Sequence, residues 1–155
     1  MPGLSDLYQE ILLEHNSKPH NFKTIDQANH TSEGYNPLCG DQISLALKVV
    51  DGVIDDVGFQ GVGCAISRAS ASMMTQSIKG QSLEKANEIF EAFHFMITEP
   101  DGDLDLDILG DLETLSGVNE YPTRIKCAIL AWHTMKAALT GDEDPISTES
   151  HLHRQ

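Results

Sequence analysis

The stretch Asn-Pro-Leu-Cys-Gly-Asp, residues 36–41, decides how this chain folds because it puts a cysteine and a carboxylate on one sharp turn. Glycine permits backbone conformations that are closed to other residues, so such a turn can aim Cys39 and Asp41 at one point. The chain has two other cysteines, and both are distant. Cys64 follows a Gly-Val-Gly run, and Cys127 ends an Arg-Ile-Lys-Cys sequence. We predict that the fold brings these four side chains together.

The composition predicts one soluble domain with a substantial core. The chain has 155 residues, of which 40% are hydrophobic, and no apolar run is long enough to cross a bilayer. Its start lacks the basic-then-apolar pattern of a signal peptide, so we expect a cytoplasmic protein without a membrane partner. The 24 acidic and 10 basic residues give a net charge of −14, which argues against nucleic acid and favours a partner with a basic patch.

The number of cysteines favours metal or thiol chemistry over disulfides. Secreted disulfide frameworks use larger and even numbers of cysteines, whereas this chain has 3. In a reducing compartment, three thiols and a nearby aspartate are typical of metal ligation or of a reactive thiol. Three unrelated buried cysteines are the alternative, because free cysteine behaves as a small hydrophobic residue. The count alone leaves both interpretations open.

Residues 43–60 predict a β-hairpin. Apolar and polar side chains alternate over residues 43–49, which is the period of a half-buried strand. The Asp-Gly pair at 51–52 is a strong signal for a two-residue turn. The Asp-Asp pair at 55–56 interrupts the alternation of the returning strand and indicates a β-bulge. Residues 22–35 could hold a short edge strand.

Helical periodicity covers five further segments, at residues 4–16, 65–79, 82–97, 108–115 and 122–139. We therefore predict one domain over residues 1–140 and a polar, disordered tail over 141–155. The acidic run from residue 99 to 113 lacks the central glycine and the closing glutamate of a calcium loop. We interpret this run as a solvated face.

The position of Cys127 on its predicted helix points away from an ordinary core role. Its side chain lies roughly 140° from the apolar stripe of Ile125, Ile129 and Trp132, because successive helical residues are rotated by about 100°. Cys64 stands where a glycine-rich turn enters a helix, and exposed amides at such a position favour a thiolate. Both thiols therefore suit a site better than a core.

Three thiolates and one carboxylate form a ligand set that suits tetrahedral zinc. Four anionic ligands on a divalent ion would leave a net negative charge. Arg124 lies one helical turn before Cys127, and we interpret it as possible support that offsets this charge. The alternative is an ordinary solvent-exposed charge at a helix end. Because no Cys-x-x-Cys pair is present, the spacing by itself is a weak metal signal.

The chain resembles the SufU branch of the IscU/NifU-N family, whose members serve iron–sulfur cluster assembly. The resemblance spans residues 5–140 and rests on three motifs, at residues 36–41, at 61–67 with 69–76, and at 124–128. Lys126 stands where IscU proteins have a histidine, and the segment between the second and third cysteines is longer than in IscU; both departures look like SufU. The Leu-Pro-Pro-Val-Lys chaperone-docking motif of IscU is missing.

This resemblance implies a compact α+β fold, with a small antiparallel sheet of about three strands and helices packed on one side. It implies zinc held by Cys39, Asp41, Cys64 and Cys127. The implied partner is a PLP-dependent cysteine desulfurase of the SufS type, which carries sulfur from L-cysteine as a persulfide. A SufU-like protein accepts that sulfur on Cys39, stimulates the desulfurase and serves downstream cluster-assembly proteins. Whether such a sulfur-transfer protein is an enzyme in its own right stays open.

Two other functions would use the same ligands. One is a scaffold on which an iron–sulfur cluster, or iron alone, is held; the missing histidine before Cys127 favours zinc over this alternative. The other is a structural zinc module without chemistry, which typically shows paired Cys-x-x-Cys knuckles that this sequence lacks.

Overall fold

The computed structural model describes residues 2–37, 39–99, 102–103, 105–141 and 146–147. Its elements, in chain order, are α1 (Pro2–Ser17), β1 (His30–Asn36), β2 (Asp41–Val50), β3 (Val53–Val62), α2 (Ala65–Ile78), α3 (Leu83–Thr98), α4 (Leu106–Leu109), the 3-10 helix η1 (Gly110–Glu120), α5 (Pro122–Thr140) and β4 (Ile146–Ser147). Each predicted helical segment is helical. The strand expected within residues 22–35 is β1, but it lies between β2 and β4 and not at the edge of the sheet.

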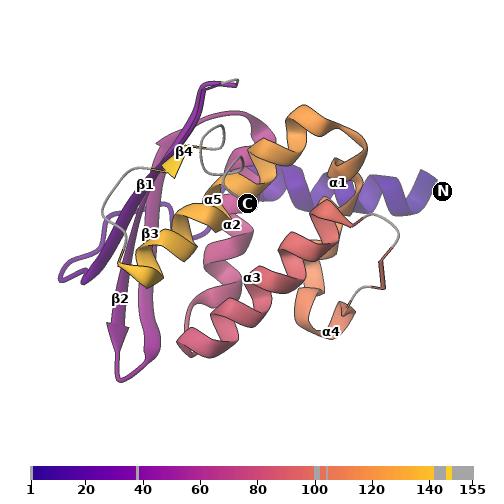
Figure 1. Ribbon diagram of the computed structural model, residues 1–155. Coiled ribbons are helices and arrows are strands. Elements are labelled where there is room, and N and C mark those ends of the chain that lie inside the picture. Colours follow the sequence, from indigo (N-terminus) through magenta and orange to yellow (C-terminus); the bar gives the residue numbers. More distant parts are fainter. Residues whose placement is uncertain (1, 38, 100–101, 104, 142–145, 148–155) are drawn as a thin grey trace.

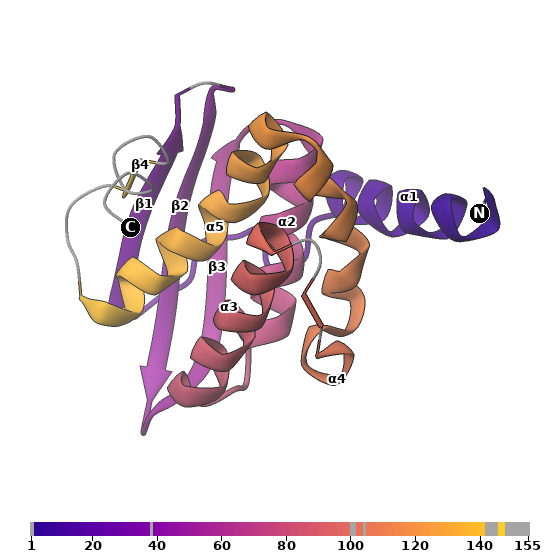
Figure 2. The same ribbon diagram turned by 45° about the vertical axis from the view of Figure 1, so that its right-hand side comes forward.

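The described strands form one sheet, and the helices cover only one of its faces (Figures 1 and 2). The strand order is β3-β2-β1-β4; the β1–β2 and β2–β3 pairs are antiparallel, and the β1–β4 pair is parallel. Helix α5 packs on β1 and β2, α2 packs on β3, α1 packs on α2, and α3 packs on α5. The α+β architecture that the resemblance implied is confirmed.

The β2–β3 hairpin forms as its sequence predicts. Buried and exposed side chains alternate along the first part of β2. The turn residues Asp51 and Gly52 have φ values of +52° and +77°, which are the left-handed conformations of a two-residue hairpin turn. The strand register shifts between Lys48 and Val49, so Asp55 on β3 is the extra residue of the predicted bulge.

The two-residue strand β4 differs from the sequence prediction. It pairs in parallel with β1 at Gly34 and Tyr35. It belongs to the polar stretch 141–155, which we predicted to be a disordered tail; residues 142–145 and 148–155 of that stretch lie outside the described part. The prediction does not hold for β4 because backbone N–H and C=O groups along the edge of β1 can pair with a further strand whatever its side chains are.

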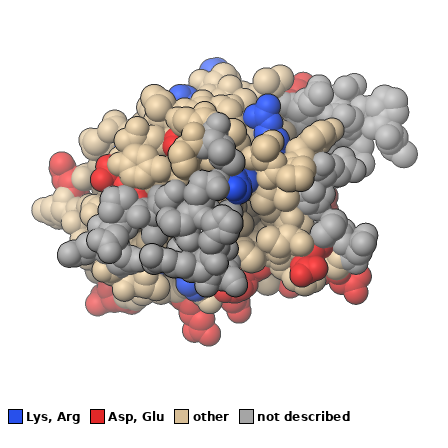
Figure 3. Space-filling model, turned by 45° about the horizontal axis from the view of Figure 1, so that its top comes forward, with Lys and Arg blue, Asp and Glu red and all other residues tan. Residues whose placement is uncertain are grey.

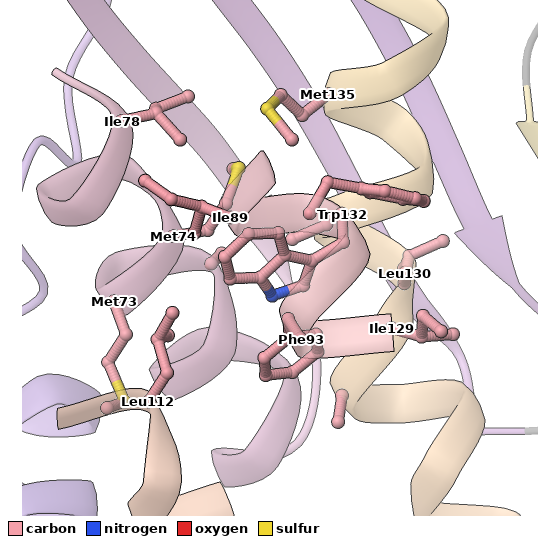
Figure 4. Close-up of a cluster of buried hydrophobic side chains, with 14 of the residues drawn as sticks. Met73, Met74, Ile78, Ile89, Phe93, Leu112, Ile129, Leu130, Trp132 and Met135 are labelled. Atoms are coloured by element: carbon pink, nitrogen blue, oxygen red, sulfur yellow. The ribbon is translucent and has the colours of Figure 1, made fainter. Parts of the chain in front are cut away.

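The main hydrophobic core lies between the sheet and the helices and includes Trp132 of α5 (Figure 4). Trp132 is fully buried, and its ring stacks on Phe93 of α3 with a centroid separation of 4.4 Å. The indole N–H donates a hydrogen bond to Ser70 Oγ of α2 at 3.1 Å. Figure 4 also labels Met73, Met74, Ile78, Ile89, Leu112, Ile129, Leu130 and Met135 of this cluster. This shared core fixes α2, α3 and α5 relative to one another.

Helix α5 approaches β1 closely because Gly34 has no side chain. A Cβ atom at Gly34 would overlap Thr134 Oγ1 and would lie 3.0 Å from Leu130 Cδ1. About one helical turn before Leu130, Cys127 contacts Asn36 near the end of β1. The close approach at the middle of β1 therefore places the third cysteine of the sequence beside the Cys39 turn.

We expect Gly34→Ala to destabilise the protein by about 1–3 kcal/mol, because the added methyl group overpacks the contact between β1 and α5. Thr134→Ala removes the atom that this methyl would overlap, so the double variant should recover part of the loss. Denaturant unfolding of all four proteins in this double-mutant cycle measures the recovery. Strictly additive losses would contradict the contact. Gly117→Ala is the matched control, since a Cβ there meets no atom within 4 Å.

Candidate metal centre

Three of the four predicted ligands converge at one end of the sheet. The Sγ atoms of Cys39 and Cys127 and a carboxylate oxygen of Asp41 all lie within 4.8 Å of one another. Cys39 belongs to the β1–β2 connection, Asp41 begins β2, and Cys127 lies in the second turn of α5. In Figures 1 and 2 this end is at the top, where the β1–β2 connection, the end of β3 and the start of α5 meet.

The turn that carries Cys39 has the sharp geometry that its sequence predicts. The backbone N–H of Cys39 donates to the carbonyl oxygen of Asn36 at 3.3 Å, and Gly40 has a φ of +72°, which favours glycine. Asn36 and Asp41 are the last paired residues of the β1–β2 ladder. The ladder therefore frames the turn and leaves the Cys39 side chain exposed beyond it.

Asp41 is held in place from two sides. Its side chain is 2% exposed, and Oδ1 accepts a hydrogen bond from the backbone N–H of Cys64 at 2.9 Å. Oδ2 accepts a hydrogen bond from Asn36 Nδ2 at 3.0 Å, and the same amide nitrogen lies 3.6 Å from Cys127 Sγ. Asn36 is thus a positioning residue that the sequence analysis did not single out. Its role depends on the strand register, which sets it opposite Asp41.

Cys64 adjoins this group of three rather than lying inside it. It is the N-cap residue of α2, where its Sγ accepts a hydrogen bond from the backbone N–H of Ser67 at 3.4 Å. Its Sγ lies more than 4.8 Å from at least one of the three converging ligand atoms. Cys64 is nevertheless close enough to Cys127 to influence the pKa of that thiol. The predicted fourth ligand therefore stands at the edge of the site.

The three thiols form a gradient from the surface inwards. Cys39 is exposed, Cys64 is half-buried and Cys127 is buried. Cys127 Sγ donates to Cys39 Sγ at 3.4 Å, and Cys127 is not a member of the main hydrophobic cluster, as its helical position predicted. Burial raises the pKa of Cys127, and its hydrogen bonds with Cys39, Cys64 and Asp41 raise it further. The inner thiol therefore acts as a hydrogen-bond donor to the accessible one.

Arg124 lies in the first turn of α5, and its side chain is exposed. It is one turn before Cys127, as the sequence predicts, so it stands on the outer side of the site. Its possible support of the site stays a prediction. Lys126, the other cation of this motif, is half-buried.

The ligand types fit zinc. Two thiols and a carboxylate surround one point, a third thiol adjoins them, and tetrahedral zinc sites use such ligands. The hydrogen bonds to Asp41 supply the outer contacts that orient a metal ligand. Within the described ranges this is the one arrangement of three or more His, Cys, Asp or Glu side chains with that spacing. None of the described helices is long and apolar enough to cross a membrane.

The sequence profile of the NifU-like N-terminal domain matches residues 7–128. The chain belongs to this family. Among its relatives is the zinc-dependent sulfurtransferase SufU of Bacillus subtilis, which is 39% identical over 141 residues that cover 91% of this chain and 95% of that protein. The iron–sulfur cluster assembly scaffold protein IscU of Thermotoga maritima is 42% identical over 134 residues, covering 86% and 92% of the two chains. The resemblance that the motifs predicted is confirmed.

Solved structures of similar chains share the fold. A Fervidobacterium islandicum crystal structure, described as an iron–sulfur cluster assembly scaffold protein for the SUF system, has a TM-score of 0.79 at 32% identity and covers 84% of this chain and 94% of that one. A hypothetical protein has a TM-score of 0.81 at 37% identity, with 88% and 98% covered. The NifU-like N-terminal domain of Brucella abortus, at 20% identity, shows the fold alone, with a TM-score of 0.78.

We expect Gly63→Ala to weaken zinc binding by about 10–100-fold, because an added Cβ would press on Asp41. That Cβ would lie 2.6 Å from Asp41 Oδ1 and 3.2 Å from its Cβ and Cγ, and hydrogen bonds on both sides keep the carboxylate from yielding. Competition with a chromophoric chelator measures the affinity. Gly117→Ala should bind zinc like the unmodified protein. Equal affinities for the two variants would show that Asp41 is not a ligand or can move freely.

Proposed function

We propose that this protein is a zinc-dependent sulfur-transfer protein of iron–sulfur cluster assembly. It takes persulfide sulfur from a SufS-type, PLP-dependent cysteine desulfurase onto Cys39 and thereby stimulates the desulfurase. One observation carries the proposal: Cys39 is the exposed member of a group whose other members, Asp41 and Cys127, are buried. An acceptor must meet a partner's sulfur, whereas its supporting ligands need not. We place this function in the cytoplasm, with downstream cluster-assembly proteins as recipients.

Zinc would be held by Cys39, Asp41 and Cys127, with Cys64 as the fourth ligand. When bound, it keeps coordinating thiols deprotonated at neutral pH. The SufU relative is named a zinc-dependent sulfurtransferase, and the side-chain types of this site agree with that metal. The chain's own residues provide the rest of the chemistry.

In the transfer step, the Cys39 thiolate attacks the outer sulfur of the partner's persulfide. A new S–S bond forms at Cys39, the partner's S–S bond breaks, and the partner's cysteine leaves as a thiolate, so no external oxidant or reductant is consumed. Cys127 is buried, so it keeps its place in the site while the exposed Cys39 exchanges sulfur. Arg124 is exposed one helical turn before Cys127, where its positive charge would favour the approach of the partner's persulfide.

Mass spectrometry of the zinc-loaded protein tests this proposal directly. After incubation with a SufS-type desulfurase and L-cysteine, we expect one added sulfur atom on the peptide that contains Cys39. Reaction without L-cysteine is the control and should add none. Sulfur found only on the peptides of Cys64 or Cys127, or on none of the three, would contradict the assignment of Cys39 as acceptor.

A second candidate function is a scaffold that holds an iron–sulfur cluster. The high identity to the IscU scaffold protein of Thermotoga maritima favours it, and the cluster or iron would occupy the same ligands. Metal analysis of the freshly isolated protein distinguishes the two functions. Stoichiometric zinc supports sulfur transfer, whereas iron with labile sulfide and no zinc supports the scaffold. A structural zinc module is disfavoured by the exposure of Cys39.

A further inference from the structure

The two helices that begin at the metal centre carry an unexpected distribution of charge. Neither α2 nor α5 has an acidic residue in its first turn; α1 has none either, whereas α3, α4 and η1 each have at least one. Helix N-termini normally favour acidic side chains because of the helix dipole. This chain has 24 acidic residues to place and instead puts Arg68 near the start of α2 and Arg124 near the start of α5. These positions cost stability, so the fold does not explain them.

Among the described residues, no ion pair neutralises these two arginines. In the described part of the chain, the ion pairs are made by Lys23, Lys48, Lys79 and Lys85, and neither arginine takes part in one. The guanidinium of Arg68 lies 5.2 Å above the ring of Phe22, which holds it without neutralising it. Figure 3, which looks on the top of the molecule, shows basic side chains near the middle of this face and acidic ones mostly toward its edges.

Exposed apolar side chains border the same centre. Val62, at the end of β3, is 64% exposed and directly precedes Gly63, whose backbone packs against Asp41. Tyr121, just before α5, is 60% exposed and lies two residues from Thr123, whose carbonyl oxygen accepts a hydrogen bond from Cys127 Sγ at 3.7 Å. A partner that docks at this centre could cover both side chains, and aromatic residues are enriched at such interfaces.

We infer that Val62, Arg68, Tyr121 and Arg124 form a docking surface around Cys39 for an acidic, partly apolar protein segment that carries the persulfide cysteine. This inference rests on the proposed function and names the chemistry of the partner at that site. We call Arg68 and Arg124 the basic rim of this surface. Elsewhere the net charge of −14 would repel an acidic segment, while the basic rim attracts it. Repulsion and attraction together orient the partner so that its sulfur meets Cys39. The net charge alone had suggested the opposite partner, one with a basic patch.

Charge reversal tests the basic rim. In stopped-flow association with a SufS-type desulfurase at low salt, zinc-loaded Arg68→Glu and Arg124→Glu should each associate about tenfold more slowly than the unmodified protein. Lys85→Glu changes the net charge equally but lies on α3, and it should associate nearly normally. The difference should shrink at high salt, because screening weakens steering. Arg68→Gln and Arg124→Gln should show smaller effects in the same direction, so the test does not depend on one variant that folds poorly.

A matched pair of valines tests the apolar part of the docking surface. Val62 and Val50 are both exposed and belong to neighbouring strands, but Val50 lies beside the hairpin turn at the other end of the sheet. Val62→Ser should speed dissociation of the desulfurase several-fold, whereas Val50→Ser should leave it unchanged. Zinc content and thermal unfolding of each variant verify that the site and the fold persist.

The outcomes separate this inference from the proposed function. If the unmodified protein accepts sulfur but Arg124→Glu and Arg68→Glu associate like Lys85→Glu, the docking surface is wrong and the function stands. If association slows equally at low and high salt, the rim does not act through charge, and the inference is again overturned. If the unmodified protein accepts no sulfur at all, both the proposed function and the inference that rests on it are wrong.

Discussion

Cys39→Ala is expected to reduce the stimulation of the cysteine desulfurase to the rate of the desulfurase alone. The variant lacks the only exposed thiol among the three cysteines, and the two that remain are half-buried and buried. Without an accessible acceptor, the partner's persulfide is not discharged and its turnover is not accelerated. Alanine formation from L-cysteine, measured at saturating variant, reports the stimulation. Gly117→Ala should stimulate like the unmodified protein.

The fold of Cys39→Ala should persist, which separates the loss of function from unfolding. Because the side chain is exposed, we expect the free energy of unfolding of the metal-free protein to change by less than about 0.5 kcal/mol. Stimulation by Cys39→Ala at the level of the unmodified protein would show that sulfur is not accepted at this position. In that case the scaffold function would become the better account of the group formed by Cys39, Asp41 and Cys127.

Trp132→Ala should cause the largest loss of stability, about 3–5 kcal/mol in the free energy of unfolding. Trp132 is fully buried, stacks on Phe93 and donates a hydrogen bond to Ser70 Oγ, so its removal leaves a cavity between three helices. Because two of these helices, α2 and α5, position Cys64 and Cys127 at the candidate metal centre, the variant should also lose zinc affinity. Denaturant unfolding and chelator competition measure the two effects.

Two control variants isolate the cause of this loss. Tyr121→Ala removes an exposed aromatic side chain and should cost less than about 0.5 kcal/mol. Trp132→Phe keeps an aromatic ring but loses the hydrogen bond to Ser70, and it should fall between the two. A loss below about 1 kcal/mol for Trp132→Ala would mean that the core does not depend on this side chain.

Local sequence patterns were sufficient for much of the fold. The alternation along β2 and the Asp51-Gly52 turn predicted the hairpin, since both depend on residues that are near neighbours. The acidic pair of β3 predicted the bulge for the same reason. Strand β4 could not be predicted, because a strand of two residues is too short to carry a periodic signal and depends on the edge that β1 presents.

By itself, the sequence determined the types of side chain at the candidate site, the helices and strands that carry them, and the sharp turn at Cys39, because these depend on side-chain chemistry and short-range backbone preferences. Only the tertiary structure decided that Cys127 meets Cys39 across 88 positions of sequence, that Asn36 orients Asp41, and that Cys64 stands at the margin. Those distances depend on strand register and on the close packing of α5 over Gly34, which long-range contacts set and no local pattern encodes.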